Sequence, residues 1–302
     1  MAKVVGKDLE FWWDSAEVPV LSENLTAQFD TQESTDSATP TTGKDHDVIR
    51  ASRSFTIEAN LYEPLGAEKT SGTLTAGTRY IVTGGTITEG SNSYTAGMIF
   101  ESDGTGTASA TNKVKPLGSR ITGKDMALTY DSLDVPVTDV DFNLKYDELD
   151  ATDSSTTGDA KEIEVSRADR ETKVTCIIRD TGTDLLTTAP VQKTVEIAFS
   201  SNAKINGYML PVAKNVVDSV NDVAKIDYTF KWIGAPTESN LGLTAGISKA
   251  FKVLLKRGTS THKEYTGNAV ITAKNVKANI SGMATVSYTM MITGALTESV
   301  AN

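Results

Sequence analysis

The 302-residue chain has one cysteine, two histidines and eight prolines. One cysteine, Cys176, cannot form an intrachain disulfide or a multi-cysteine zinc or iron–sulfur site. It is interpreted as a small buried side chain on a strand. His46 and His262 each stand in a polar stretch without apolar neighbours that would tune an imidazole, and both are interpreted as solvated loop residues.

Motifs that carry chemistry are also missing. The chain has no Walker loop, no Gly-x-Ser-x-Gly elbow and no dinucleotide fingerprint between a strand and a helix. The acidic residues near 45–47 and 147–153 lack the central glycine and closing glutamate of a calcium loop. No apolar run approaches membrane-spanning length, and residues 1–8 do not read as a secretion signal. We therefore expect no catalytic residues, no cofactor, no metal site and no membrane partner.

The chain has fewer basic than acidic residues, with 29 Lys and Arg and 39 Asp and Glu, so its formal net charge is -10. Binding to nucleic acid by phosphate neutralisation is opposed by this balance. Any contact with DNA is therefore expected to be non-adhesive.

What the chain has in abundance is Thr, Ser, Val and Gly, which favour strands and turns. Residues 49–61 alternate between apolar and polar side chains, a period of two. The prediction is an all-β fold with sandwich or barrel layers. Helical signal is confined to residues 211–220, read as a short helix or another strand, and to a counterpart near 268–276.

Two internal repeats organise the sequence. Residues 6–20 match 123–137 without a gap, with Gly, Lys, Asp, Asp, Ser, Val, Pro and Val in register. Each copy continues through a strand, a long polar loop and a second strand. The predicted strands are 23–29 and 48–62 around the loop 30–47, and 139–146 and 161–179 around the loop 147–160.

The second repeat lies later in the chain, where 193–197 answers 249–253 and 228–239 answers 288–299. The two copies of the first repeat form the front halves of two domains, and the two copies of the second repeat form their back halves. Because both back halves follow the second front half, the order predicts that one domain is inserted within the other. An inner domain would span 120–240, and an outer domain would close from 1–65 and 246–302. A different pairing of the halves remains an alternative at this point.

Residues 69–119 belong to neither repeat and predict a small β module with glycine-rich turns. Residues 74–80 are similar to compact modules attached to other virion proteins. The module is expected to project from the outer surface. Trp12 and Trp13 would point to opposite faces of a regular strand, one into a core and the other either into a core or towards a partner.

The duplicated front half with its polar loop, and the back halves ending in 233–237 and 293–297, resemble phage tail tube (major tail) proteins. The resemblance covers everything outside the insert. It implies two β-sandwich domains, each with one short helix, and rings of three chains that are pseudo-hexameric and stack into a conduit for DNA. The net charge of -10 predicts that the wall of this conduit is acidic or neutral. The implied partners are the chain itself, the tape measure protein and the tail terminator protein, and DNA would pass without specific binding. The implied location is the virion tail, with assembly in the host cytoplasm.

Within this interpretation the two polar loops are expected to contact the adjacent ring. The residues assigned to these contacts are Asp30, Thr31, Gln32, Glu33, Asp36, Lys44, Asp45, Asp147, Glu148, Asp150, Asp153 and Asp159. The alternative function is a β-rich adhesin or carbohydrate-binding surface protein, which would account for the insert and the tryptophans but does not require two paired domains with matched loops.

Overall fold

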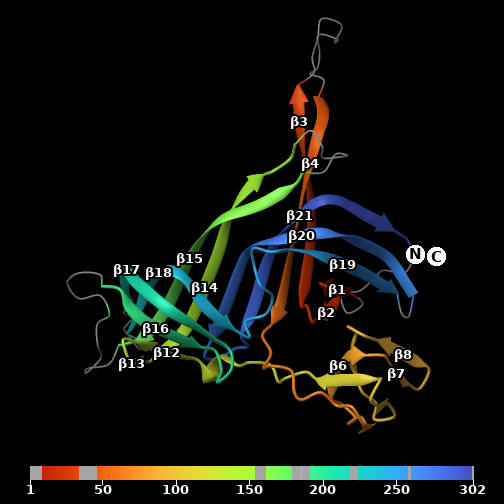
Figure 1. Cartoon of the computed structure of the whole chain (residues 1–302). Coiled ribbons are helices and arrows are strands. Elements are labelled where there is room, and N and C mark those ends of the chain that lie inside the picture. Colours follow the sequence, from red (N-terminus) through yellow and green to blue (C-terminus); the bar gives the residue numbers. More distant parts are fainter. Residues whose placement is uncertain are drawn as a thin grey trace, which may run out of the picture.

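The structure is a computed structural model that describes residues 9–33, 46–153, 161–178, 185, 191–217, 224–257 and 260–300 (Figure 1). The first part of the chain forms β1 (Leu9–Trp13), β2 (Ala16–Val18), β3 (Ser22–Glu33) and β4 (His46–Asn60). The insert follows with β5 (Gly72–Thr73), β6 (Arg79–Gly84), β7 (Thr86–Glu89), β8 (Asn92–Thr95), β9 (Ile99–Glu101), β10 (Thr107–Ala108) and β11 (Lys113–Pro116).

The remainder of the chain is also made of strands. They are β12 (Ala127–Tyr130), β13 (Leu133–Val135), β14 (Val137–Asp150), β15 (Ile163–Ile177), β16 (Lys193–Ala198), β17 (Lys204–Val217), β18 (Lys225–Ser239), β19 (Ser248–Arg257), β20 (Ser260–Asn279) and β21 (Thr285–Ser299). Within the described residues the only helical element is a 3-10 turn, Gly123–Asp125. The all-β prediction is confirmed.

Of the two interpretations of residues 211–220, a short helix or another strand, the strand is confirmed for 211–217, which belong to β17. Residues 218–220 lie outside the described part of the chain. The counterpart at 268–276 lies within β20. β-branched valines favour the pleated strand. Pro211, which lacks an N–H, is accommodated because the register of β17 with β18 shifts between Pro211 and Ala213.

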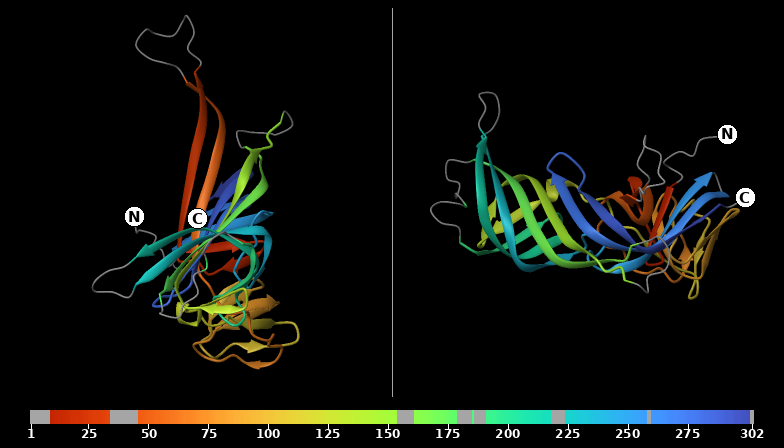
Figure 2. Two further views of the ribbon diagram at one scale, coloured as in Figure 1. Left: turned by 90° about the vertical axis from the view of Figure 1, so that its left-hand side faces the viewer. Right: turned by 90° about the horizontal axis from the view of Figure 1, so that it is seen from above.

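The long strands form one continuous antiparallel sheet in the order β17-β18-β15-β14-β20-β21-β4-β3 (Figure 2). The smaller strands β16, β12 and β13 continue from β17, and β19, β1 and β2 continue from β20. The sheet thus contains two equivalent seven-strand units. Unit A is β1 to β4 with β19 to β21, and unit B is β12 to β18.

Strand pairing in each unit follows the sequence repeats. In unit A, β4 pairs with β21, with Ile57 opposite Tyr288; in unit B, β15 pairs with β18, with Val174 opposite Tyr228. The outer segments of the chain therefore pair with each other around the middle segment.

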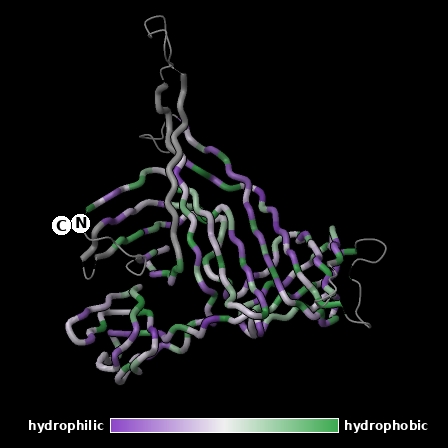
Figure 3. Tube along the Cα trace, turned by 180° about the vertical axis from the view of Figure 1, so that it is seen from behind, coloured by the Kyte–Doolittle hydropathy of each residue, from purple (hydrophilic) through white to green (hydrophobic). Residues whose placement is uncertain are grey.

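The small strands of each unit lie across the long ones and enclose a core. Phe11 of β1 packs on Phe55 of β4 with ring centroids 5.7 Å apart, and Tyr130 of β12 packs on Phe230 of β18 at 5.8 Å. Both phenylalanines of the long strands are buried. Full burial of such a side chain contributes about 1.5–3 kcal/mol. Apolar and polar residues alternate along the long strands, leaving one face for the core and one for solvent (Figure 3).

The insert has a core of its own, made by Leu74, Tyr80, Val82, Ile87, Phe100, Ala108 and Val114. Glu89 is buried in the module, and its carboxylate accepts hydrogen bonds from Ser102 Oγ at 2.5 Å and the N–H of Asp103 at 3.0 Å. The two ends of the insert meet where Gly66 N donates to Pro116 O at 2.9 Å. The module is therefore a separately packed unit on a narrow attachment.

The predicted polar loops are too long. β3 continues to Glu33 and β4 begins at His46, while β14 continues to Asp150 and β15 begins at Ile163. Their polar composition indicated exposure to water, and a two-stranded hairpin satisfies its backbone groups without burying either face. Both hairpins project from the same side of the sheet (Figures 1 and 2).

Candidate assembly interface

The two units of one chain are joined by a strand pair. β14 of unit B pairs with β20 of unit A over seven residues, from Asp139 opposite Asn279 to Lys145 opposite Ala273. At the centre of this junction Phe142 lies opposite Val276, and both are 0% exposed. The junction is thus as well packed as the interior of either unit.

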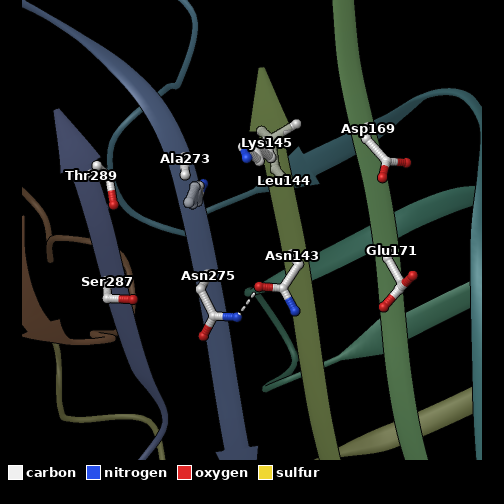
Figure 4. Close-up of a pocket in the computed structure, with 10 residues that line it drawn as sticks. Asn143, Leu144, Lys145, Asp169, Glu171, Ala273, Asn275, Ser287 and Thr289 are labelled. Atoms are coloured by element: carbon white, nitrogen blue, oxygen red, sulfur yellow. Dashed lines mark hydrogen bonds between the residues drawn. The ribbon is translucent and has the colours of Figure 1, made fainter. Parts of the chain in front are cut away.

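The solvent face of the junction is held by side-chain amides. Asn275 Nδ2 donates to Asp141 Oδ1 at 2.6 Å and also to Asn143 Oδ1 across the strand boundary (Figure 4). Lys277 Nζ lies 3.5 Å from Asp141 Oδ2. Each unit therefore supplies partners to the other on this face.

The core side of the junction contains an ion pair with one buried member, Lys274, and one partly exposed member, Glu238. Lys274 of unit A is 2% exposed, and its Nζ donates to Glu238 Oε2 of unit B at 2.6 Å. Burial lowers the pKa of Lys274, and the Glu238 carboxylate opposes that shift. Leu241 and Ala245, in the segment that connects the two units, are buried beside this pair.

Each unit also has one strand that is equivalent to a junction strand but leaves an edge without a partner strand among the described residues. These free edges are β3 and the part of β17 after Met209; the first part of β17 pairs with β16. In the repeat, β3 corresponds to β14, and β17 corresponds to β20. The residues Ala-Lys-Asn-Val occur at 213–216 in β17 and again at 273–276 in β20. Val216 is 54% exposed, whereas its counterpart Val276 is 0% exposed.

The broad solvent face of the sheet carries both signs of charge. Residues that share this face through the strand registers include the carboxylates of Glu58, Asp139, Asp141, Asp169, Glu171 and Asp227 and the ammonium groups of Lys145, Lys173, Lys225, Lys231 and Lys277. Lys231 Nζ lies 2.9 Å from Asp169 and 3.1 Å from Glu171. Asp169 and then Glu171 raise the pKa of Lys231. The face is close to neutral and hydrated.

The residues assigned to inter-ring contacts fall into three groups. Asp30, Thr31, Gln32 and Glu33 lie in β3, and Asp147, Glu148 and Asp150 lie in β14, with Asp153 just beyond it. Asp36, Lys44, Asp45 and Asp159 lie outside the described residues. Hydrogen bonds from Thr152 are the largest cause lowering the pKa of Asp150, whose carboxylate also lies 3.6 Å from Lys161 Nζ.

The junction residues were missed by the sequence interpretation. The repeated Ala-Lys-Asn-Val was the available signal, because it places a lysine and an asparagine within otherwise strand-like sequence at equivalent positions of both units. That the two copies differ so much in exposure is visible only in three dimensions.

Comparison with known proteins gives little. No protein-family model matches the chain, and no curated protein matches it. One solved structure, a chain from the virion of native gene transfer agent (GTA) particle, aligns with 39% of this chain and 98% of its own length, at 13% identity and a TM-score of 0.35.

The described residues contain no group of three His, Cys, Asp or Glu side chains arranged to hold a metal ion. No helix among them is long and apolar enough to cross a membrane.

Proposed function

We propose that the chain is a structural virion protein that polymerises into stacked rings, the tail tube of a phage. The observation that carries the proposal is the pair of free edges, β3 and β17, which repeat the two strands of the internal junction. A long unpaired edge is a template for another strand. In this chain the strand that fits the free edge of β17 is β3, which lies at the other end of the same sheet.

Joining β17 of one copy to β3 of the next makes a head-to-tail contact. Such contacts either close into a ring or continue as a filament. Closure converts the open sheet into a barrel in which every long edge is paired. With two equivalent units per chain, three copies give a six-unit ring, the arrangement that the resemblance implies.

In this ring the mixed-charge face of the sheet would line the channel. A wall without excess positive charge offers few fixed phosphate contacts, so DNA would pass without being retained. The projecting ends of β3–β4 and β14–β15 would meet the adjacent ring. The tape measure and tail terminator proteins are the further partners of this proposal, which places the chain in the virion tail.

Electron microscopy and light scattering of the purified chain test the proposal directly. The expected result is three-copy rings or tubes for the wild type and folded monomers for Val216→Asp, because the charge would be buried without a partner in the new strand pair. Leu133→Asp is the matched control, since Leu133 is 50% exposed on β13, at the far edge of the sheet. A wild type that stays monomeric at high concentration would refute assembly and favour the adhesin alternative.

A further inference from the structure

The ion pair Lys274–Glu238 joins unit A to unit B, and both residues have counterparts in the repeat. Lys274 lies opposite Tyr288 in its sheet as Lys214 lies opposite Tyr228. Glu238 lies opposite Ile205 as Glu298 lies opposite Tyr265. The repeat therefore places Lys214 on the free edge of β17 in unit B, and it places Glu298 on β21 at the position in unit A that Glu238 occupies in unit B.

Within a single chain, Glu298 pairs with a lysine of its own unit, whereas Glu238 pairs with Lys274 of the other unit. Lys263 Nζ donates to Glu298 Oε1 at 2.5 Å, and this contact raises the pKa of Lys263. The counterpart of Lys263 in unit B is Ala203, which has no charge to offer Glu238. Both members of the Lys263–Glu298 pair are partly exposed, with side-chain exposures of 40% and 47%.

From these relationships we propose that Glu298 exchanges Lys263 for Lys214 of the adjacent copy when two copies pair. The proposal rests on the proposed assembly through β17 and β3 and names its charged contact. The register of the internal junction then also places Val216 opposite Leu25 and Asn215 opposite Thr26 of the next copy, as Val276 lies opposite Phe142 and Asn275 opposite Asn143.

The pair would fix the register of the copies. A slip of one residue turns every side chain of a strand to the other face. After such a slip the Lys214 side chain would point to the channel side of the sheet and could not reach Glu298. A slip of two residues moves it by about 7 Å along the strand. Since an unmatched charge at a partly buried contact costs more than a matched pair gains, misaligned pairings are disfavoured.

Charge reversal and restoration test the exchange. The protein concentration at half-assembly, measured by light scattering, is expected to rise at least about tenfold for Lys214→Glu and for Glu298→Lys. The double variant K214E/E298K is expected to return towards the wild-type value. Lys263→Ala removes the competitor of Lys214 and is expected to lower that concentration, a change of opposite sign.

Lys193→Glu is the control, because Lys193 forms a partly exposed pair with Asp131 and lies opposite Met209 of β17, outside the segment 213–217 that repeats the junction. Thermal melting of each monomer verifies folding. If the wild type assembles while Lys214→Glu assembles equally well, or the double variant is no better than the single ones, the ion-pair exchange is wrong and the assembly stands. If the wild type itself does not assemble, the proposed function fails.

Discussion

The Glu17 carboxylate on β2 accepts a hydrogen bond from the backbone N–H of Ile99 in the insert, with N and Oε2 2.7 Å apart. Beside it, Glu17 N donates to Gly97 O at 3.0 Å. Trp12 is 8% exposed and lies between the insert and Lys252, whose Nζ is 4.4 Å from the ring centroid. The insert is therefore docked on the β1–β2 hairpin of unit A and does not hang from its attachment alone.

Gly97 is the residue on which this docking depends most. It has φ of +91°, and a Cβ there would lie 2.4 Å from Ser15 O and 2.8 Å from the Trp12 ring. Gly97→Ala is therefore expected to undock the module and to destabilise it by about 1–3 kcal/mol. Hydrogen exchange at the Ile99 amide is the measurement.

Gly77→Ala is the matched control, because Gly77 has φ of +75° and nothing within 4 Å of a Cβ. It imposes similar backbone strain without the clash. Equal acceleration of Ile99 exchange in the two variants would show that strain within the module, and not contact with Trp12, explains the effect.

A second prediction concerns the whole insert. Because Gly66 and Pro116 are hydrogen-bonded neighbours, residues 67–115 can be replaced by a short glycine linker without moving either unit. The shortened chain is expected to form rings as the wild type does, with Trp12 fluorescence shifted to the red by exposure to water. Loss of assembly would place the insert in the tube wall.

Cys176 gives a prediction about pH. Burial is the main cause that raises the pKa of its thiol to about 12, with the Asp227 charge adding to it. In the unfolded chain the thiol ionises near its usual pKa of about 8.5. Stability from this group is thus fully present below about pH 8.5 and is lost as pH rises towards 12, by up to about 1.4 kcal/mol per pH unit.

Denaturant unfolding between pH 8 and pH 11 measures this loss, and Cys176→Ala is expected to show a shallower alkaline decline. At pH 8 a thiol reagent is expected to label the native protein only as fast as it unfolds. Rapid stoichiometric labelling under native conditions would contradict the burial of Cys176.

Much of the fold follows from local sequence, and the assembly edges do not. Period-two alternation at 49–61 predicted strand, and the front repeat predicted that β3–β4 and β14–β15 would correspond. The sequence left 211–217 open between helix and strand, because apolar residues spaced three or four apart also fit a strand with a bulge after Pro211. The β14–β20 junction was beyond reach, since it pairs Phe142 with Val276 through a register that no turn or local pattern specifies.

The mixed-charge solvent face of the sheet, which is the channel face in the proposed ring, gives a prediction on DNA. Asp169→Asn, Glu171→Gln and Asp227→Asn together remove three negative charges from that face. Assembled tubes of this triple variant are expected to retain short duplex DNA at about 50 mM salt and release it at about 200 mM, because phosphate contacts weaken with salt. Co-sedimentation is the measurement.

Wild-type tubes are expected to retain no DNA at either salt concentration. The matched control neutralises three carboxylates that do not share the channel face, with Asp131→Asn, Asp134→Asn and Glu196→Gln, and is expected to behave as the wild type. DNA retained equally by both triple variants would mean that net charge, and not the channel face, decides binding.

The last prediction concerns the projecting hairpins β3–β4 and β14–β15. They occupy equivalent positions in the two units, so in a closed ring each would occur at regular intervals on the same side and could contact the next ring in the same way. Replacing 31–47 and 148–162 by tight turns removes the projections but keeps the strand pairs from Ser22 to Asp30 and from Val137 to Tyr146 with their partners. The shortened chain is expected to form single rings that do not stack, because ring closure uses β17 and the first half of β3 whereas stacking uses the hairpin ends.

Electron microscopy distinguishes rings from tubes. Shortening only one hairpin is the graded control, and it is expected to give fewer and shorter tubes. Tubes of normal length from the doubly shortened chain would show that ring stacking depends on other surfaces.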